Sequence, residues 1–187
     1  MARTTVYRVG SLDLATHEGE VRDHFALIDS VKPAHHPVGR SNCLYASADL
    51  AGFQRWVNAL MMCSRWEKTT HEITVDDADV MVYSIEEYDR IPTHTGWRNE
   101  TREERAEKFW ASGMTLAEWN ALPEWRRIGE EVEVLVDPTK IVSAKTLSSG
   151  MLVSRMKKAN MEEMQVKDLR RILRNYDRSS TPALAAA

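Results

Sequence analysis

The sequence predicts an α+β fold, in which short strands gather in separate clusters and helices lie between them. Three observations lead to this prediction. The strand-like segments are short runs rich in β-branched and aromatic residues, and stretches with helical spacing of apolar residues separate them. Residues 101–104 (Thr-Arg-Glu-Glu) and 115–118 (Thr-Leu-Ala-Glu) each match the capping-box pattern that begins a helix. Strands and helices do not alternate one by one, which disfavours a doubly wound parallel sheet.

The amino-terminal third of the chain predicts two strands and two helices. Residues 4–9 (TTVYRV) are rich in β-branched side chains and predict a strand, whereas 18–31 place apolar side chains on one helical stripe. Two prolines make residues 32–37 a loop. A second strand is predicted over 43–47, and the apolar spacing of 48–66 predicts a helix.

The rest of the chain predicts four more strands and two more helices. The helices begin at the two capping boxes, and Pro123 ends the second one. The strands cover residues 71–75, 79–85, the run that contains Glu131 and Glu133, and about 140–147. We expect one domain over residues 1–150 and a basic helical extension with a frayed end over 151–187.

Composition narrows the class of protein. The chain has 187 residues, of which 43% are hydrophobic and 28% charged, as in ordinary globular proteins. No apolar run approaches the ~20 residues that span a membrane, and the amino terminus lacks a signal-peptide core. Two cysteines are too few for a disulfide framework, and the histidines have no zinc-site spacing. We therefore expect a cytoplasmic protein with no membrane partner and no metal.

The net charge of −3 conceals an uneven distribution. Residues 155–178 contain eight basic and four acidic side chains, so the remainder of the chain is acidic. A basic tail on an acidic body is compatible with a nucleic-acid partner. It is equally compatible with a solvated amphipathic helix whose apolar side docks on the body, and the second interpretation is preferred.

Two carboxylates stand at the head of an apolar, β-branched run, Glu131-Val132-Glu133-Val134-Leu135-Val136. Because side chains alternate along a strand, both glutamates and Leu135 should share one face, with the three valines on the other. Neighbours on one face lie roughly 7 Å apart, so both carboxylates can line one small site. One carboxylate can then stabilise a developing cation while the other orients or deprotonates a nucleophile. The alternative is a solvated strand edge.

Three polar clusters follow one another along the chain: Tyr7-Arg8, Tyr45-Ala46-Ser47 and Glu131-Val132-Glu133. This order resembles the arginine–serine–glutamate class of the ADP-ribosyltransferase superfamily, over roughly residues 4–147. The resemblance implies a split β-sandwich with flanking helices and NAD as cofactor. Residues 39–42 (Gly-Arg-Ser-Asn), followed by Leu44-Tyr45-Ala46, also resemble the RES-type toxins, which consume NAD.

The resemblance implies a role for each candidate residue. Glu133 would stabilise the oxocarbenium-like transition state, and Glu131 would orient or deprotonate the acceptor. The residues expected to bind the cofactor are Arg8, Tyr45, Ser47 and Arg40. The loop before the catalytic strand would bind the acceptor substrate through Trp119, Trp125, Arg126 and Arg127.

The expected function is NAD-dependent transfer of ADP-ribose to a macromolecule. A glutamate at position 131 favours a protein arginine as acceptor over a nucleic acid, since the first glutamate of E-x-E accompanies arginine acceptors in the family. Two alternatives remain open. One is a toxin that only hydrolyses NAD, and the other is a non-catalytic accessory protein that binds nucleic acid.

Overall fold

The computed structural model describes residues 2–14, 23–54, 69–92, 100–127 and 131–158 of the chain. The chain divides into two compact units, Met1–Lys145 and Thr146–Ala187. The described structure is mixed α and β, with two antiparallel sheets and several helices, as an α+β fold requires. The candidate site residues all lie in the first unit.

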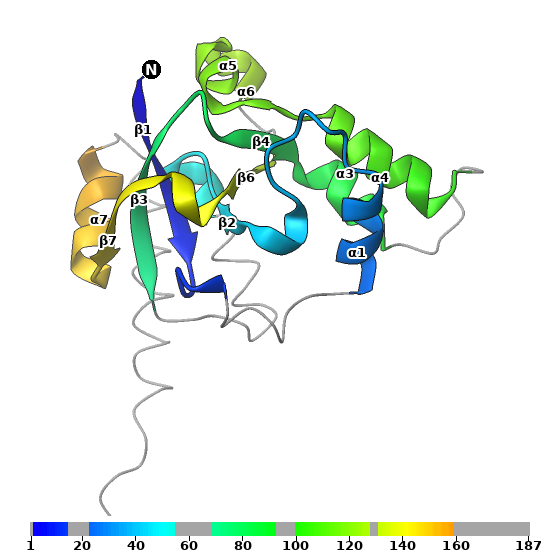
Figure 1. The fold of residues 1–187 in the computed structure, drawn as a ribbon. Coiled ribbons are helices and arrows are strands. Elements are labelled where there is room, and N and C mark those ends of the chain that lie inside the picture. Colours follow the sequence, from blue (N-terminus) through cyan, green and yellow to red (C-terminus); the bar gives the residue numbers. More distant parts are fainter. Residues whose placement is uncertain (1, 15–22, 55–68, 93–99, 128–130, 159–187) are drawn as a thin grey trace, which may run out of the picture. The chain divides into compact units, whose positions relative to one another are not determined.

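The strands form a three-stranded sheet of order β1-β3-β7 and a four-stranded sheet of order β2-β6-β4-β5 (Figure 1). The first sheet consists of β1 (Arg3–Val9), β3 (Thr70–Asp76) and β7 (Ile141–Leu147). The second consists of β2 (Leu44–Ala46), β6 (Val132–Val136), β4 (Met81–Ser84) and β5 (Met114–Thr115). All six predicted strands are confirmed, whereas the two-residue β5 was not predicted.

Most helices begin where the sequence places a cap. Thr101 and Thr115 both close capping boxes, which confirms the predicted starts of α4 (Arg102–Ala111) and α5 (Leu116–Ala121). The strand predicted over 79–85 ends one residue early, because the Ser84 side chain caps α3 (Ile85–Arg90). The other helices in the described part of the chain are α1 (Asp23–Ser30), α6 (Glu124–Arg127), α7 (Ser149–Lys158) and the short 3-10 turns η2 (Arg40–Asn42) and η3 (Pro138–Lys140).

Several predictions extend beyond the described residues. The helix predicted over 18–31 is described only from Asp23, and the helix predicted over 48–66 runs from Leu50 to Gln54 before the description stops. Most of the basic extension also lies outside the described residues.

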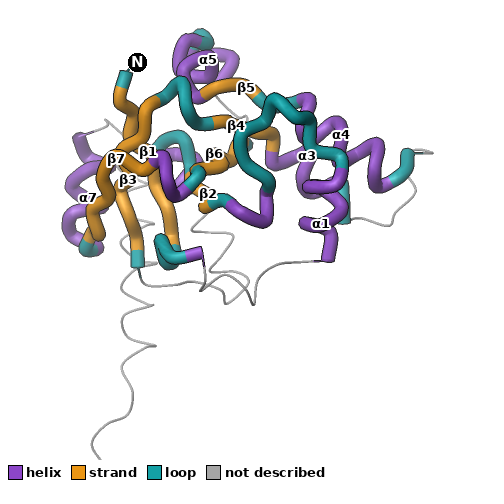
Figure 2. Tube along the Cα trace, in the orientation of Figure 1, coloured by secondary structure: helices purple, strands orange, loops and turns teal. Residues whose placement is uncertain are grey.

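Two apolar cores lie on opposite faces of the four-stranded sheet. The intersheet core joins side chains of both sheets, namely Val6, Ile73, Val75, Val82, Val134 and Val136 with their neighbours. The helix-side core joins the other face to α1, α3 and α4, through Phe25, Ile28, Tyr83, Tyr88, Phe109, Trp110 and Leu135. Figure 2 shows these three helices lying together beside β4. The predicted alternation along β6 is therefore confirmed from Glu133 to Val136.

Gly113 occupies a position where no side chain fits. A Cβ atom there would lie 2.6 Å from Tyr83 Cε1 and 2.9 Å from His36 Cε1, and both rings are buried. We expect Gly113→Ala to lower the free energy of unfolding by about 1–3 kcal/mol, because the rings must move in a packed core. Urea denaturation followed by circular dichroism measures the change.

Gly150 provides the matched control, since a Cβ there meets no atom within 4 Å. Gly150→Ala, in α7, should be neutral or stabilising by up to about 1 kcal/mol, because alanine favours the helix over glycine. Equal effects of the two substitutions would contradict the packing described around Gly113.

Candidate functional site

A buried ion pair between Arg40 and Glu133 lies at the centre of the candidate site. Arg40 begins η2, and Glu133 lies on β6, directly opposite Tyr83 of β4. Arg40 Nη1 donates to Glu133 Oε1, and Nη2 donates to Oε2 at 3.0 Å, so the contact is bidentate. Arg40 is only 3% exposed and Glu133 only 5%. The carboxylate expected to act in catalysis is therefore held by a side chain from another segment.

Aromatic rings surround the Arg40 guanidinium. The ring centroids of Tyr88, Tyr45, Phe25 and Phe109 lie 3.6, 4.6, 5.2 and 5.4 Å from Cζ. These rings come from α3, β2, α1 and α4, so four elements converge on one cation. A cation–π contact contributes about 0.5–2 kcal/mol and is strongest where water is excluded. The rings thus help to offset the cost of burying the charge.

Arg40 stays charged in this cluster, whereas the neighbouring side chains of Tyr45 and Cys43 stay neutral. Burial alone lowers the pKa of Arg40, but attraction and hydrogen bonding to Glu133 raise it above the ordinary value, so the guanidinium remains charged. Burial raises the pKa of the Tyr45 phenol and of the Cys43 thiol, so both side chains stay neutral. A neutral, buried thiol is a poor nucleophile.

Asp29 of α1 fixes the turn that carries Arg40. Its carboxylate accepts hydrogen bonds from the backbone nitrogens of Arg40, at 2.6 Å, and Ser41, at 2.9 Å. A Cβ at Gly39 would lie 3.0 Å from this carboxylate, so a larger residue there would force the carboxylate to shift by a few tenths of an ångström. Tyr45 Oη donates to the Arg40 carbonyl at 2.6 Å on the other side. The Arg40 backbone is thus held from both α1 and β2.

Arg8 connects the Tyr7-Arg8 segment to the Tyr45-Ala46-Ser47 segment. Its Nε donates to the Ser11 carbonyl at 2.8 Å, and Nη1 donates to the Tyr45 carbonyl at 2.9 Å. Since Tyr45 bonds Arg40 and Arg40 bonds Glu133, a continuous chain of contacts runs from β1 to β6. Arg8 is 3% exposed, so its guanidinium is engaged by backbone carbonyls inside the protein.

Ser47 and Glu131 flank the ion pair without joining it in the described contacts. Ser47 is buried and exchanges backbone hydrogen bonds with Tyr7. Ala46 pairs with Val134, so continuing the antiparallel register places Ser47 opposite Glu133. Glu131 precedes β6, and its side chain is exposed. The two glutamates of the E-x-E segment therefore differ sharply in environment.

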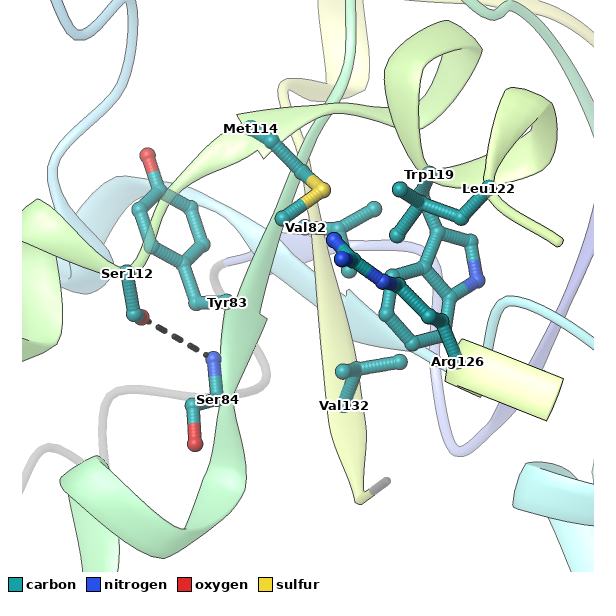
Figure 3. Close-up of a pocket in the computed structure, with 9 residues that line it drawn as sticks. All are labelled: Val82, Tyr83, Ser84, Ser112, Met114, Trp119, Leu122, Arg126 and Val132. Carbon is teal, nitrogen blue, oxygen red and sulfur yellow. Dashed lines mark hydrogen bonds between the residues drawn. The ribbon is translucent and has the colours of Figure 1, made fainter. Parts of the chain in front are cut away.

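Two of the residues expected to bind the acceptor, Trp119 and Arg126, line a pocket of about 400 Å³ (Figure 3). Its lining consists of Val82, Tyr83, Ser84, Ser112, Met114, Trp119, Leu122, Arg126 and Val132. Trp119 is buried in the wall, whereas Arg126 is exposed, and Arg127 is half-buried outside the lining. The side chain of Trp125 lies outside the described residues. The structure thus brings Trp119 and Arg126 together, apart from the ion pair.

Four residues of the cluster were not predicted from the sequence: Asp29, Phe25, Tyr88 and Phe109. Phe25 was expected only as a core residue, and nothing in the sequence was a reason to select Tyr88 or Phe109. No local pattern shows that α1, α3 and α4 meet around Arg40. Gly39, next to the arginine, is the one local signal of a close backbone approach.

Among the described residues, no three histidine, cysteine, aspartate or glutamate side chains are grouped to hold a metal ion. None of the helices in the described part of the chain has the length and apolar character needed to cross a bilayer. Comparison with protein-family models, curated proteins and solved structures finds no match to this chain.

The ion pair predicts strong coupling between its two members. Arg40→Met leaves a buried carboxylate without its partner, which should lower the free energy of unfolding by about 3–5 kcal/mol. Glu133→Leu leaves the buried Arg40 cation without its partner and should cost a similar amount. The loss of unfolding free energy in the double variant should be far smaller than the sum of the losses in the two single variants. A double-mutant cycle by urea denaturation measures this coupling.

The exposed pair of Arg90 with Glu86 is the control, because Arg90→Ala should cost less than about 1 kcal/mol. Additive effects of Arg40→Met and Glu133→Leu would show that the buried pair does not form in solution.

Proposed function

We propose that the protein cleaves NAD and transfers its ADP-ribose to a macromolecular acceptor, with Glu133 as the central carboxylate. The observation that carries the proposal is the chain of contacts from Arg8 through Tyr45 and Arg40 to Glu133. Three segments that resemble the ADP-ribosyltransferase motifs lie far apart in the sequence and meet in this one cluster. We also propose that the fold is the split β-sandwich of that family and that the protein acts in the cytoplasm.

The proposed reaction exchanges one bond at the anomeric carbon for another. The bond between the ribose C1′ and the nicotinamide nitrogen breaks, and nicotinamide leaves with the electron pair. The oxocarbenium-like ribose then gains a bond to the acceptor, and the acceptor's proton passes to Glu131. Glu133 exchanges its contact with Arg40 for a contact with the positively charged ribose. Tyr45 offers an aromatic face for nicotinamide.

The exposure of Glu131 supports a role that needs access to a large acceptor. It is exposed beside the buried Glu133, so a protein side chain can approach it from solvent. A carboxylate also attracts a guanidinium, which supports a protein arginine as the acceptor.

A second function is favoured by the enclosure of the ion pair. Arg40 and Glu133 are almost fully buried, and four aromatic rings cover the guanidinium. An enclosed pair of this kind also suits a purely structural role. The second candidate is therefore a non-catalytic binding protein, in which NAD is neither bound nor consumed.

Incubation of the purified protein with labelled NAD and a cell lysate separates these functions. We expect label on macromolecules and free nicotinamide with the native protein. Glu131→Gln, an exposed change that should leave the fold intact, should keep nicotinamide release and lower transfer by roughly 10²–10⁴. Glu133→Gln should lose both activities, and its fold is checked by circular dichroism.

Glu103→Gln, an exposed change on α4, is the matched control and should leave both activities unchanged. Protease and nuclease treatment of the labelled product identifies the acceptor class. Nicotinamide release without transfer by the native protein would indicate an NAD glycohydrolase. Intact NAD in every sample would refute the enzymatic proposal and leave the second candidate.

A further inference from the structure

We propose that the pocket beside the amino-terminal end of β6 binds a small molecule that combines an apolar ring with an anionic group. The pocket lies within the first unit and is lined by β4, β5, α5, α6 and Val132 of β6 (Figure 3). Glu133, Tyr45 and Arg8 take no part in the lining. The inference therefore stands independently of NAD chemistry.

The walls of the pocket favour an apolar ligand. Val82, Met114, Leu122 and Val132 contribute aliphatic and thioether surface, and Trp119 contributes an indole face. The volume of about 400 Å³ lies within the range of pockets that hold small molecules. A planar ring can pack against the indole, and the flexible Met114 side chain can adapt to its shape.

Arg126 favours a ligand that carries a negative charge. It is the charged member of the described lining, and Figure 3 shows its guanidinium reaching from α6 toward Val82 and Met114. A guanidinium has five N–H donors and binds a carboxylate or phosphate through two parallel hydrogen bonds, in addition to contacts it already makes. The exposure of Arg126 places this group where the pocket meets solvent.

Both serines of the lining already accept a hydrogen bond from a backbone nitrogen, and Ser112 also donates one. Ser84 Oγ accepts from the Glu87 backbone nitrogen at 3.3 Å and caps α3. Ser112 Oγ donates to the Phe109 carbonyl at 2.7 Å and accepts from the Ser84 backbone nitrogen at 3.1 Å. Selectivity for a polar group therefore depends mainly on Arg126. The positive charge of Arg126 disfavours a cationic ligand in this pocket.

Three compounds that share a phenyl ring test this inference: phenylacetate, neutral phenylacetamide and cationic 2-phenylethylamine. Saturation-transfer NMR on the full chain without NAD should show phenylacetate binding at least ten-fold more tightly than phenylacetamide, and no binding of the amine. Arg126→Gln should weaken phenylacetate binding at least ten-fold and leave phenylacetamide binding unchanged. Arg3→Gln, at an exposed arginine of β1, is the matched control and should change neither affinity.

Leu122→Trp fills the pocket from the end of α5 and should abolish binding of both phenyl compounds. Equal affinity for phenylacetate and the amine, or an affinity insensitive to Arg126→Gln, would overturn the proposal. Absence of phenylacetate binding at millimolar concentration would also overturn it. None of these outcomes depends on whether the protein consumes NAD, so the two proposals fail separately.

Discussion

The arrangement of the first unit depends on the ion pair between Arg40 and Glu133. Removing two charges from water costs several kcal/mol for each, and only good geometry and additional contacts recover that cost. Here the contact is bidentate, four rings surround the cation, and Asp29 and Tyr45 hold the turn that carries it. The pair therefore fixes where η2, β2, β6 and the three helices of the helix-side core meet.

Strand β6 separates two environments because consecutive side chains point to opposite faces. Glu133 faces the helix-side core and its buried cation, whereas Val132 faces the pocket that Arg126 borders. Two residues adjacent in sequence thus face two separate environments, each of which contains one arginine. In the buried environment Arg40 pairs with Glu133, whereas Arg126 beside the pocket is exposed to solvent.

The sequence predicted those features that depend on neighbouring residues. The six strands, the caps at Thr101 and Thr115 and the alternation after Glu133 follow from local spacing, and the structure confirms them. The short α3 was missed because Ser84 capping overrode the strand propensity of its neighbours. The partner of Glu133 is 93 residues away, and the four aromatic contacts of Arg40 come from four elements. A local sequence pattern does not predict such long-range contacts, so only the structure shows what surrounds Arg40 and Glu133.

The measurement that tests the central claim most directly is an NMR titration of the Arg40 side-chain N–H resonances with NAD. A guanidinium enclosed by Glu133 and four rings should give slowly exchanging, strongly shifted signals. If the pair is the centre of an NAD site, adding NAD will move these signals, because Glu133 must exchange its partner. Signals that stay unchanged at millimolar NAD would contradict the account and leave the ion pair as a purely structural element.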